Sequence, residues 1–190
     1  MQTTHKLALI VALSLGSAAA MAGEIAGSTI SSTAAVNTSV GFLATARQNI
    51  GVAEGNGKIT NSSISVNGAN NTASGFLSTA TQSVGRATEN GKISSSVVVG
   101  QGLNNVAAGF LSSATQDVGF AKNNGKVEST IVVASGASNV AGGFLANAKQ
   151  QIGGASGNGS LKNSVVIANT SVNSAGGFLS TAEQSVGVAK

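Results

Sequence analysis

The chain has 190 residues, no cysteine, proline, tyrosine or tryptophan, one histidine, and a formal net charge of +4. The histidine is His5, so the rest of the chain lacks the usual ligands of zinc, haem and iron–sulfur centres and the bases of Cys–His and Ser–His catalysis. The basic side chains are scattered, and no tyrosine or tryptophan is present to stack on bases, so we expect no nucleic-acid partner.

Residues 1–22 have the pattern of a secretory signal peptide. Lys6 supplies a basic start, residues 7–15 are apolar, and residues 20–22 (Ala-Met-Ala) form a small-residue cleavage site. No later apolar run approaches the ~20 residues of a membrane-spanning helix. We therefore predict a mature domain over 23–190 without a transmembrane segment, secreted to the extracellular space or the cell surface. The alternative for the first segment is a buried N-terminal helix.

A single 34-residue unit fills the rest of the chain. The triplet Gly-Phe-Leu recurs at that period without interruption, and a fixed period of 20–50 residues is typical of stacked repeat architectures. We predict five stacked repeats, over 24–57, 58–91, 92–125, 126–159 and 160–190.

Asparagine, glutamine and phenylalanine each occupy one position of the unit in all five copies, and we predict that each set forms a ladder along the stack. Equivalent residues of stacked strands lie ~4.8 Å apart, so identical amides can hydrogen-bond to one another and identical rings can stack. A buried amide is tolerated when its donors and acceptors are paired, which a column of like amides achieves. The alternative is that these amides are ordinary solvated loop residues. The predicted ladders are Asn37, Asn71, Asn105, Asn139 and Asn173; Gln48, Gln82, Gln116, Gln150 and Gln184; and Phe42, Phe76, Phe110, Phe144 and Phe178.

Asn-Gly pairs at the ends of the repeats predict tight turns there. An Asn-Gly pair closes each of the first four copies, as at Asn56-Gly57, and such pairs favour tight turns with positive φ.

The first half of the unit is predicted to be a strand, whereas the second half fits two structures. Residues 96–99 are rich in β-branched side chains, which favours a strand. Leu77, Ala80 and Val84 lie at helical spacing, but Ala80 and Val84 equally fit the alternation of a strand. Gly85 would lie inside such a helix and would cost it about 1 kcal/mol. We therefore predict an all-β fold, a β-solenoid of five stacked repeats, with a strand-plus-helix repeat solenoid as the alternative.

Two segments resemble the repeats of bacterial amyloid proteins. Residues 96–107 (Ser-Val-Val-Val-Gly-Gln-Gly-Leu-Asn-Asn-Val-Ala) resemble the curlin repeat, which alternates Ser, Gln, Gly and Asn-x-Ala. Residues 105–116 are similar to the repeats of the Fap-type amyloid subunits of pseudomonads. The unit departs from these patterns in its Phe-Leu pair, and it is longer than a curlin repeat. The resemblance implies a secreted, curli-like functional amyloid, with an outer-membrane secretion pore and a nucleator subunit as partners.

Both ends of the predicted stack carry the full repeat framework, and no proline interrupts strand pairing. The last repeat of one copy therefore matches the first repeat of the next, and a contact of this kind does not close but gives a filament. It would place Glu183 against Arg47 and Lys190 against Glu54, two pairs of opposite charge. We predict head-to-tail assembly with Arg47, Glu54, Glu183 and Lys190 at the subunit junction.

The leading functional prediction is a structural subunit that polymerises with itself into an extracellular amyloid-like fibre of a biofilm matrix or cell-surface coat. The alternative is a monomeric β-solenoid adhesin or surface binding module, which requires a patch that breaks the repeat symmetry. Arg86 and Phe120 differ at one position predicted to face outward. We predict no enzymatic activity, catalytic residue, metal or cofactor, because the six acidic residues, Asp117 among them, are predicted to be solvated charges without a carboxylate pair.

Overall fold

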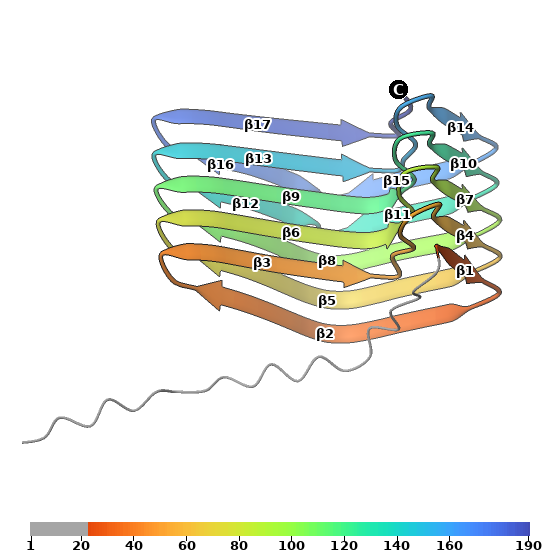
Figure 1. Cartoon of the computed structure of the whole chain (residues 1–190), viewed down its shortest axis with the longest axis horizontal. Coiled ribbons are helices and arrows are strands. Elements are labelled where there is room, and N and C mark those ends of the chain that lie inside the picture. Colours follow the sequence, from red (N-terminus) through yellow and green to blue (C-terminus); the bar gives the residue numbers. More distant parts are fainter. Residues whose placement is uncertain (1–22) are drawn as a thin grey trace, which may run out of the picture.

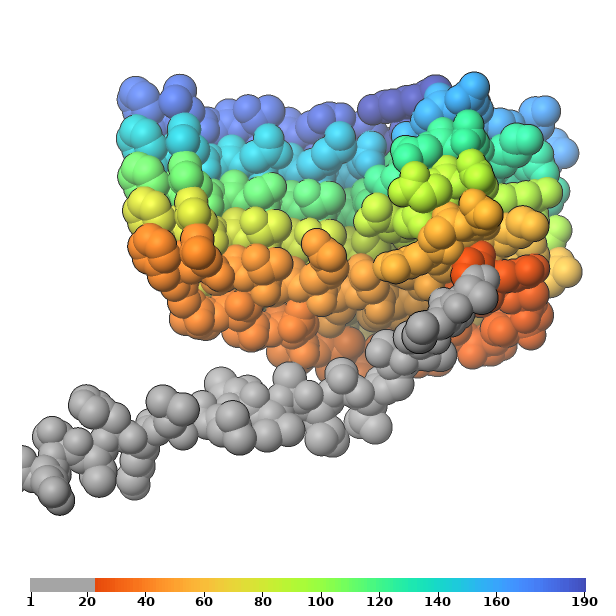
Figure 2. Space-filling model, in the orientation of Figure 1, coloured from red at the N-terminus to blue at the C-terminus, as the bar shows by residue number. Residues whose placement is uncertain are grey.

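The protein is a parallel β-solenoid. The computed structural model describes residues 23–190, and the predicted signal peptide over 1–22 lies outside the described residues. The described chain makes five turns, and strands pair in parallel with their equivalents one 34-residue repeat later (Figure 1). The turns lie on one another as layers (Figure 2). The predicted all-β solenoid of five stacked repeats is confirmed.

Each turn contributes to three sheets, which we name A, B and C in chain order. Sheet A consists of β1 (Glu24–Ala26), β4 (Lys58–Thr60), β7 (Lys92–Ser94), β10 (Lys126–Glu128) and β14 (Ser160–Lys162). Sheet B consists of β2 (Thr29–Val40), β5 (Ser63–Ser74) and β8 (Val97–Ala108), followed by the shorter pairs β11 (Ile131–Ser135) with β12 (Ser138–Gly142) and β15 (Val165–Asn169) with β16 (Val172–Gly176). Sheet C consists of β3 (Leu43–Ile50), β6 (Leu77–Arg86), β9 (Leu111–Phe120), β13 (Leu145–Ile152) and β17 (Leu179–Val186).

The second half of each repeat is a strand of sheet C, so the strand-plus-helix alternative is wrong. Along β6, Ala80, Gln82 and Val84 are fully buried and face sheet B, as strand alternation requires. The glycine that disfavoured a helix has a different role. Gly85 has a φ of 69°, and a Cβ on it would lie 2.7 Å from the Val98 side chain of the next turn, so both conformation and packing require glycine.

The core has two parts of different composition. Between sheet A and the adjoining parts of sheets B and C it is filled by branched side chains such as Ile59, Ile93 and Val98. Between the remaining parts of sheets B and C the buried apolar side chains are all alanine, for example Ala80 and Ala107. Because alanine is small, this second part brings the two sheets close enough for amide side chains of one sheet to reach the backbone of the other.

A column of residues with positive φ bends sheet B. Gly68, Gly102 and Gly136 occupy it in the middle turns, with Ala34 and Thr170 in the terminal ones. The bend shifts the alternation of side chains by one residue. In β5 the inward-facing residues Val66 and Ala69 are three residues apart, whereas inward-facing residues elsewhere in the strand are two apart. The chain thereby keeps apolar side chains inward on both sides of the bend.

The prediction of positive φ at the Asn-Gly pairs is wrong. In the first two turns positive φ occurs at the preceding residue, Gly55 (63°) and Glu89 (36°). The glycine of the pair is needed for close approach instead, because a Cβ on Gly57 would lie 2.6 Å from the backbone nitrogen of Thr88 in the next turn. The turn itself is set by stacking between repeats, which the local sequence does not reveal.

Candidate assembly interface

The five asparagines form one hydrogen-bonded column between sheets B and C. The Nδ2 of each of the first four donates to the Oδ1 of the asparagine one turn later, at 2.7–2.8 Å. The three middle members are fully buried. Asn105 Nδ2 also lies within hydrogen-bond distance of the backbone oxygens of Ala80 (3.1 Å) and Thr115 (2.9 Å) in sheet C. Because only the amide nitrogen can donate to these carbonyls, they fix the direction of the ladder.

The five glutamines form a second column that runs in the opposite direction. The Nε2 of each of the last four donates to the Oε1 of the glutamine one turn earlier, at 2.6–2.8 Å. Here, too, backbone carbonyls fix the amide, since Gln82 Nε2 donates to Ala69 O of sheet B at 3.1 Å. The two ladders are therefore antiparallel. Within residues 23–190, Asn173 Nδ2 and Gln184 Oε1 lack an in-column partner at one end, and Asn37 Oδ1 and Gln48 Nε2 lack one at the other.

Sheets B and C are offset along the solenoid axis by part of a turn. Asn105 of β8 reaches the carbonyls of both β6 and β9, the sheet C strands of the previous turn and of its own. Gln116 of β9 donates to the oxygen of Ser138, at the start of β12 in the following turn. Each sheet C strand therefore lies at a height between the sheet B strands of its own turn and of the next.

This offset leaves a step at each end of the described chain. At the C-terminal end β17 projects beyond sheet B, so Gln184 is exposed whereas its equivalent Gln150 is fully buried. At the N-terminal end β2 projects beyond sheet C, so Asn37 is only partly buried while Ala46 of β3 is 1 % exposed. The two steps have complementary shapes.

A third column, of hydroxyl side chains, follows the corner between sheets A and B and was not predicted. The backbone N–H groups of Ser28, Ser62 and Thr130 each donate to the Oγ of the residue one turn later, at 3.2 Å. The direction is that of the asparagine ladder. The signal in the sequence is a Ser or Thr in all five copies, at Ser28, Ser62, Ser96, Thr130 and Ser164.

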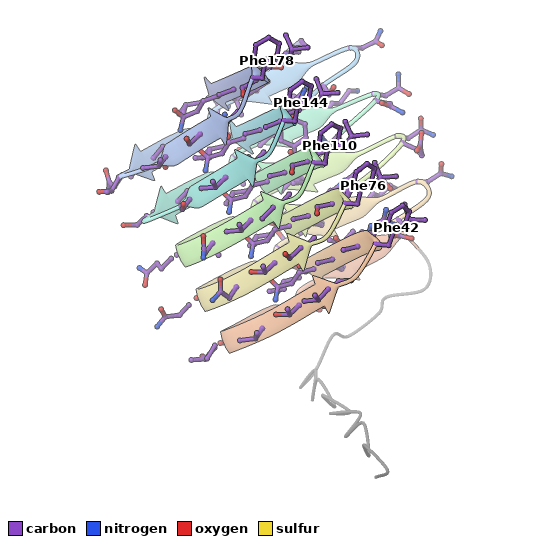
Figure 3. The ribbon with its side chains drawn as sticks, turned by 90° about the vertical axis from the view of Figure 1, so that its left-hand side faces the viewer. Phe42, Phe76, Phe110, Phe144 and Phe178 are labelled. Atoms are coloured by element: carbon purple, nitrogen blue, oxygen red, sulfur yellow. The ribbon has the colours of Figure 1, made fainter. Side chains whose placement is uncertain are left out.

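The five phenylalanines form an exposed ladder along the corner between sheets B and C (Figure 3). Neighbouring rings are nearly parallel, with centroids 5.0–5.3 Å apart. The terminal rings of Phe42 and Phe178 are 70 % and 76 % exposed, whereas the inner three are 44–45 % exposed. The difference is the ring face that a neighbouring turn covers, so each end offers one more stacking contact.

The four predicted junction residues divide between the two ends. Arg47 and Glu54 lie at the N-terminal end, and Glu183 and Lys190 at the C-terminal end. Glu183 Oε2 is 3.7 Å from the Nζ of Lys149, which occupies the same column one turn earlier, and Glu183 Oε1 is 4.0 Å from Lys190 Nζ. The Lys149–Glu183 pair is the intramolecular counterpart of the predicted Glu183–Arg47 contact.

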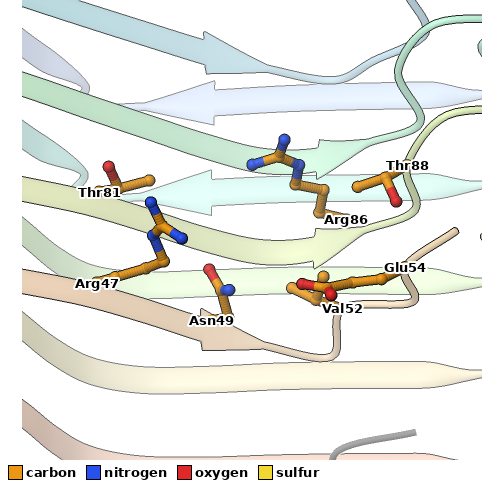
Figure 4. Close-up of a pocket in the computed structure, with 7 residues that line it drawn as sticks. All are labelled: Arg47, Asn49, Val52, Glu54, Thr81, Arg86 and Thr88. Carbon is orange, nitrogen blue, oxygen red and sulfur yellow. The ribbon is translucent and has the colours of Figure 1, made fainter. Parts of the chain in front are cut away.

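A shallow groove of about 200 Å³ lies at the N-terminal end, between the outer face of sheet C and the arc that returns to sheet A (Figure 4). Among the polar groups along it, Asn49 Oδ1 and Arg86 Nε have no hydrogen-bond partner within the described chain. The groove breaks the repeat symmetry, because Phe120 takes the position of Arg86 in the next turn and is buried. Its lining residues are Arg47, Asn49, Val52, Glu54, Thr81, Arg86 and Thr88.

Two predictions about outward positions are wrong. Asp117, predicted to be a solvated charge, has a side chain only 2 % exposed, with Oδ2 3.0 Å from Lys122 Nζ and 4.0 Å from a guanidinium nitrogen of Arg86. Phe120, predicted to face outward, is buried, with the Lys122 ammonium 3.9 Å from its ring centroid. Burial lowers the pKa of Lys122, and Asp117 opposes that shift. In the sequence, the sign of this buried ion pair is an acid and a lysine five residues apart, and this spacing occurs in one copy only.

Comparison with protein-family models, curated proteins and solved structures finds no match for the chain. Within residues 23–190 no helix is long and apolar enough to cross a membrane. The same residues contain no group of three or more His, Cys, Asp or Glu side chains placed to hold a metal ion.

Proposed function

We propose that the chain is a secreted structural subunit that stacks head to tail into an extracellular amyloid-like fibre of a biofilm matrix or cell-surface coat. The observation that carries the proposal is the complementarity of the two ends. The projecting β17 of one subunit fits the recessed sheet C edge of the next, whose projecting β2 fits over β15 and β16. The signal-peptide pattern of residues 1–22 and the curlin resemblance support secretion, and the resemblance alone supports a secretion pore and a nucleator as partners.

The contacts across such a junction follow from the contacts between turns. Asn173 Nδ2 donates to the Oδ1 of the next subunit's Asn37, and the next subunit's Gln48 donates to Gln184 Oε1, as their equivalents do inside one chain. Phe178 stacks on the next subunit's Phe42. Every column thus continues without interruption from one subunit into the next.

Backbone pairing dominates the attraction at the junction. The free strands at the N-terminal end have 3, 12 and 8 residues, which gives on the order of twenty backbone hydrogen bonds. At a net contribution of about 1 kcal/mol or less for each bond, this term far exceeds the few tenths of a kcal/mol of an exposed charge pair. The Glu183–Arg47 pair therefore sets register rather than strength.

The opposite orientation, with two N-terminal ends together, is disfavoured by the same geometry. It would bring two projecting β2 strands against each other and leave the acceptor ends of both asparagine columns without a donor. An unpaired amide enclosed in a junction costs roughly 1–3 kcal/mol. The fibre is therefore polar.

Charge reversal at the junction tests the proposal. Seeded elongation of residues 23–190 is measured by thioflavin fluorescence. We expect Arg47→Glu to slow this elongation about two- to fivefold, because an attraction of a few tenths of a kcal/mol becomes a repulsion. Since Lys149 also pairs with Glu183, the restoring variant reverses the whole column: Arg47→Glu, Lys149→Glu and Glu183→Arg together. The control is Lys126→Glu, an exposed lysine of sheet A in the fourth turn.

The outcomes separate the two parts of the proposal. Restored elongation in the triple variant and unchanged elongation in the control support the head-to-tail junction. A triple variant no faster than Arg47→Glu contradicts the register. A wild-type chain that stays monomeric after removal of denaturant contradicts the fibre itself.

The second candidate function is a monomeric surface binding module, and the groove of Figure 4 favours it, because it breaks the repeat symmetry and carries two arginines. In the proposed fibre this groove lies beside the junction, next to Glu183 of the preceding subunit. A folded monomer that does not polymerise but binds small anions at Arg47 and Arg86 would support this function over the fibre.

A further inference from the structure

Sheet B carries no charged residue. None of its seven strands contains Lys, Arg, Asp or Glu, so every charged side chain between residues 23 and 190 lies on sheet A, on sheet C or in the arcs. A protein surface of this size normally mixes charges of both signs. Charge is thus segregated to two of the three sides of the solenoid.

The outer face of sheet B is also partly apolar. We name it the B face and define it by the outward-pointing residues of these strands. Its most exposed apolar members are Val36, Val40, Ile131, Val165, Ile167 and Val172. Between them stand neutral polar side chains such as Ser65 and Gln101. Long exposed β surfaces without charge or proline are typical of sheet-to-sheet contacts.

We infer that two stacks pair laterally through their B faces, so that the mature fibre contains two solenoid columns with sheet B at its centre. This inference rests on the proposed function, because it concerns how the proposed stacks associate. The occupant of the B face is the B face of a second copy.

The area of the B face suits such a contact. Strands of 12 residues at ~3.3 Å per residue are about 40 Å long, and five turns at ~4.8 Å rise about 24 Å, giving roughly 950 Å² per subunit. A stable protein interface buries ~800 Å² on each partner. One pair of subunits already reaches this size, and the contact grows with every subunit added to the stacks.

Charge explains why the partner is a second B face. A strongly charged partner finds no opposite charge on this side, whereas a second B face adds none to be desolvated. The chain is net positive, so repulsion between copies acts on the other sides and leaves the B face as the side of least repulsion. Because equivalent residues repeat at every turn along both stacks, neutral side chains of one face can interdigitate with those of the other.

A matched pair of lysine substitutions tests the inference. Ser65→Lys places a charge on the B face in the second turn, and Thr79→Lys places one on the outer face of sheet C in the same turn; both residues are exposed. Gln101→Lys, in the third turn, is a second B-face variant in case Ser65→Lys does not fold. Mass per length of the fibres is measured by dark-field electron microscopy.

We expect two subunits per ~24 Å of fibre for the wild type and for Thr79→Lys, and one subunit per ~24 Å for the B-face variants, a twofold loss. Wild-type fibres with one subunit per ~24 Å overturn the lateral pairing but leave head-to-tail stacking intact. Paired fibres in both B-face variants overturn it equally. A wild-type chain that forms no fibre contradicts the proposed function instead.

Discussion

Replacing Asn105 by alanine should be among the most destabilising single substitutions in the amide ladders. Asn105 is fully buried in the middle of its column. Its Oδ1 accepts from Asn71 Nδ2 at 2.7 Å, and its two Nδ2 hydrogens serve Asn139 Oδ1 at 2.7 Å and the Thr115 carbonyl at 2.9 Å. Three hydrogen bonds at about 1 kcal/mol each, plus roughly 1–3 kcal/mol for the unpaired Asn139 acceptor, give a loss of about 4–6 kcal/mol in the free energy of unfolding.

The matched control is Asn37→Ala at the end of the same column. Asn37 is partly exposed, and water can replace its bonds to Asn71 Oδ1 (2.8 Å) and to the Arg47 carbonyl (2.9 Å). We expect a loss of only about 1 kcal/mol for the isolated subunit. In the proposed fibre this position is enclosed by the junction, so Asn37→Ala should slow elongation more than its small effect on stability suggests.

Equilibrium unfolding in urea, followed by circular dichroism of residues 23–190 at concentrations too low for assembly, measures both losses. A clearly larger loss for Asn105→Ala supports paired, buried amides. Equal losses, or a loss below 1 kcal/mol for Asn105→Ala, would show that water reaches the column and would refute the ladder as a source of stability.

Three further predictions use the same unfolding assay. Thr170→Gly should stabilise the subunit by about 1 kcal/mol, because Thr170 has a φ of 50° that a β-branched residue adopts only with strain, and Gly102→Ala at the equivalent position should destabilise it by a similar amount; the opposite signs would contradict the strained bend. Gly109→Ala should lower the free energy of unfolding by more than about 3 kcal/mol, since the new Cβ would overlap the Gly75 carbonyl oxygen. Gly142→Ala has open space around its Cβ and should change the free energy of unfolding by less than about 0.5 kcal/mol. Similar effects of the two variants would mean that the turns are stacked less closely. Lys122→Met should lower the free energy of unfolding more than Asp117→Asn does, because it leaves the more deeply buried charge, that of Asp117, without its lysine partner. The double variant should recover most of this loss. Additive losses would show that the two residues do not act as a pair.

The columns could be predicted from the sequence, because the five copies of the unit show which positions keep the same residue and which vary. The repeat period, the strands of sheet C and the residues of the asparagine, glutamine and phenylalanine columns all follow from five copies that vary around a constant framework. A helix in the second half was disfavoured by the glycine at position 85, and the structure shows a strand there. The hydroxyl column at Ser62 and its equivalents was available from the same comparison of copies.

Features that depend on contact between sheets could not be predicted. The offset between sheets B and C arises from how amides such as Asn105 fit between two strands of the facing sheet, and no periodicity encodes it. The burial of Asp117 depends on Lys122 and Phe120, which occur together in one copy only, so the other repeats gave no indication of it. The groove lined by Arg47 and Arg86 is likewise a departure from repetition.

In the proposed fibre, whole five-turn solenoids stack end to end. The most direct test is the axial rise per subunit in fibres of residues 23–190, determined by electron cryo-microscopy. Five turns at ~4.8 Å predict a rise of about 24 Å per subunit within each stack, with strands ~4.8 Å apart along the axis. A rise of about 4.8 Å per subunit, in which each chain forms a single flat layer, would contradict end-to-end stacking of folded solenoids.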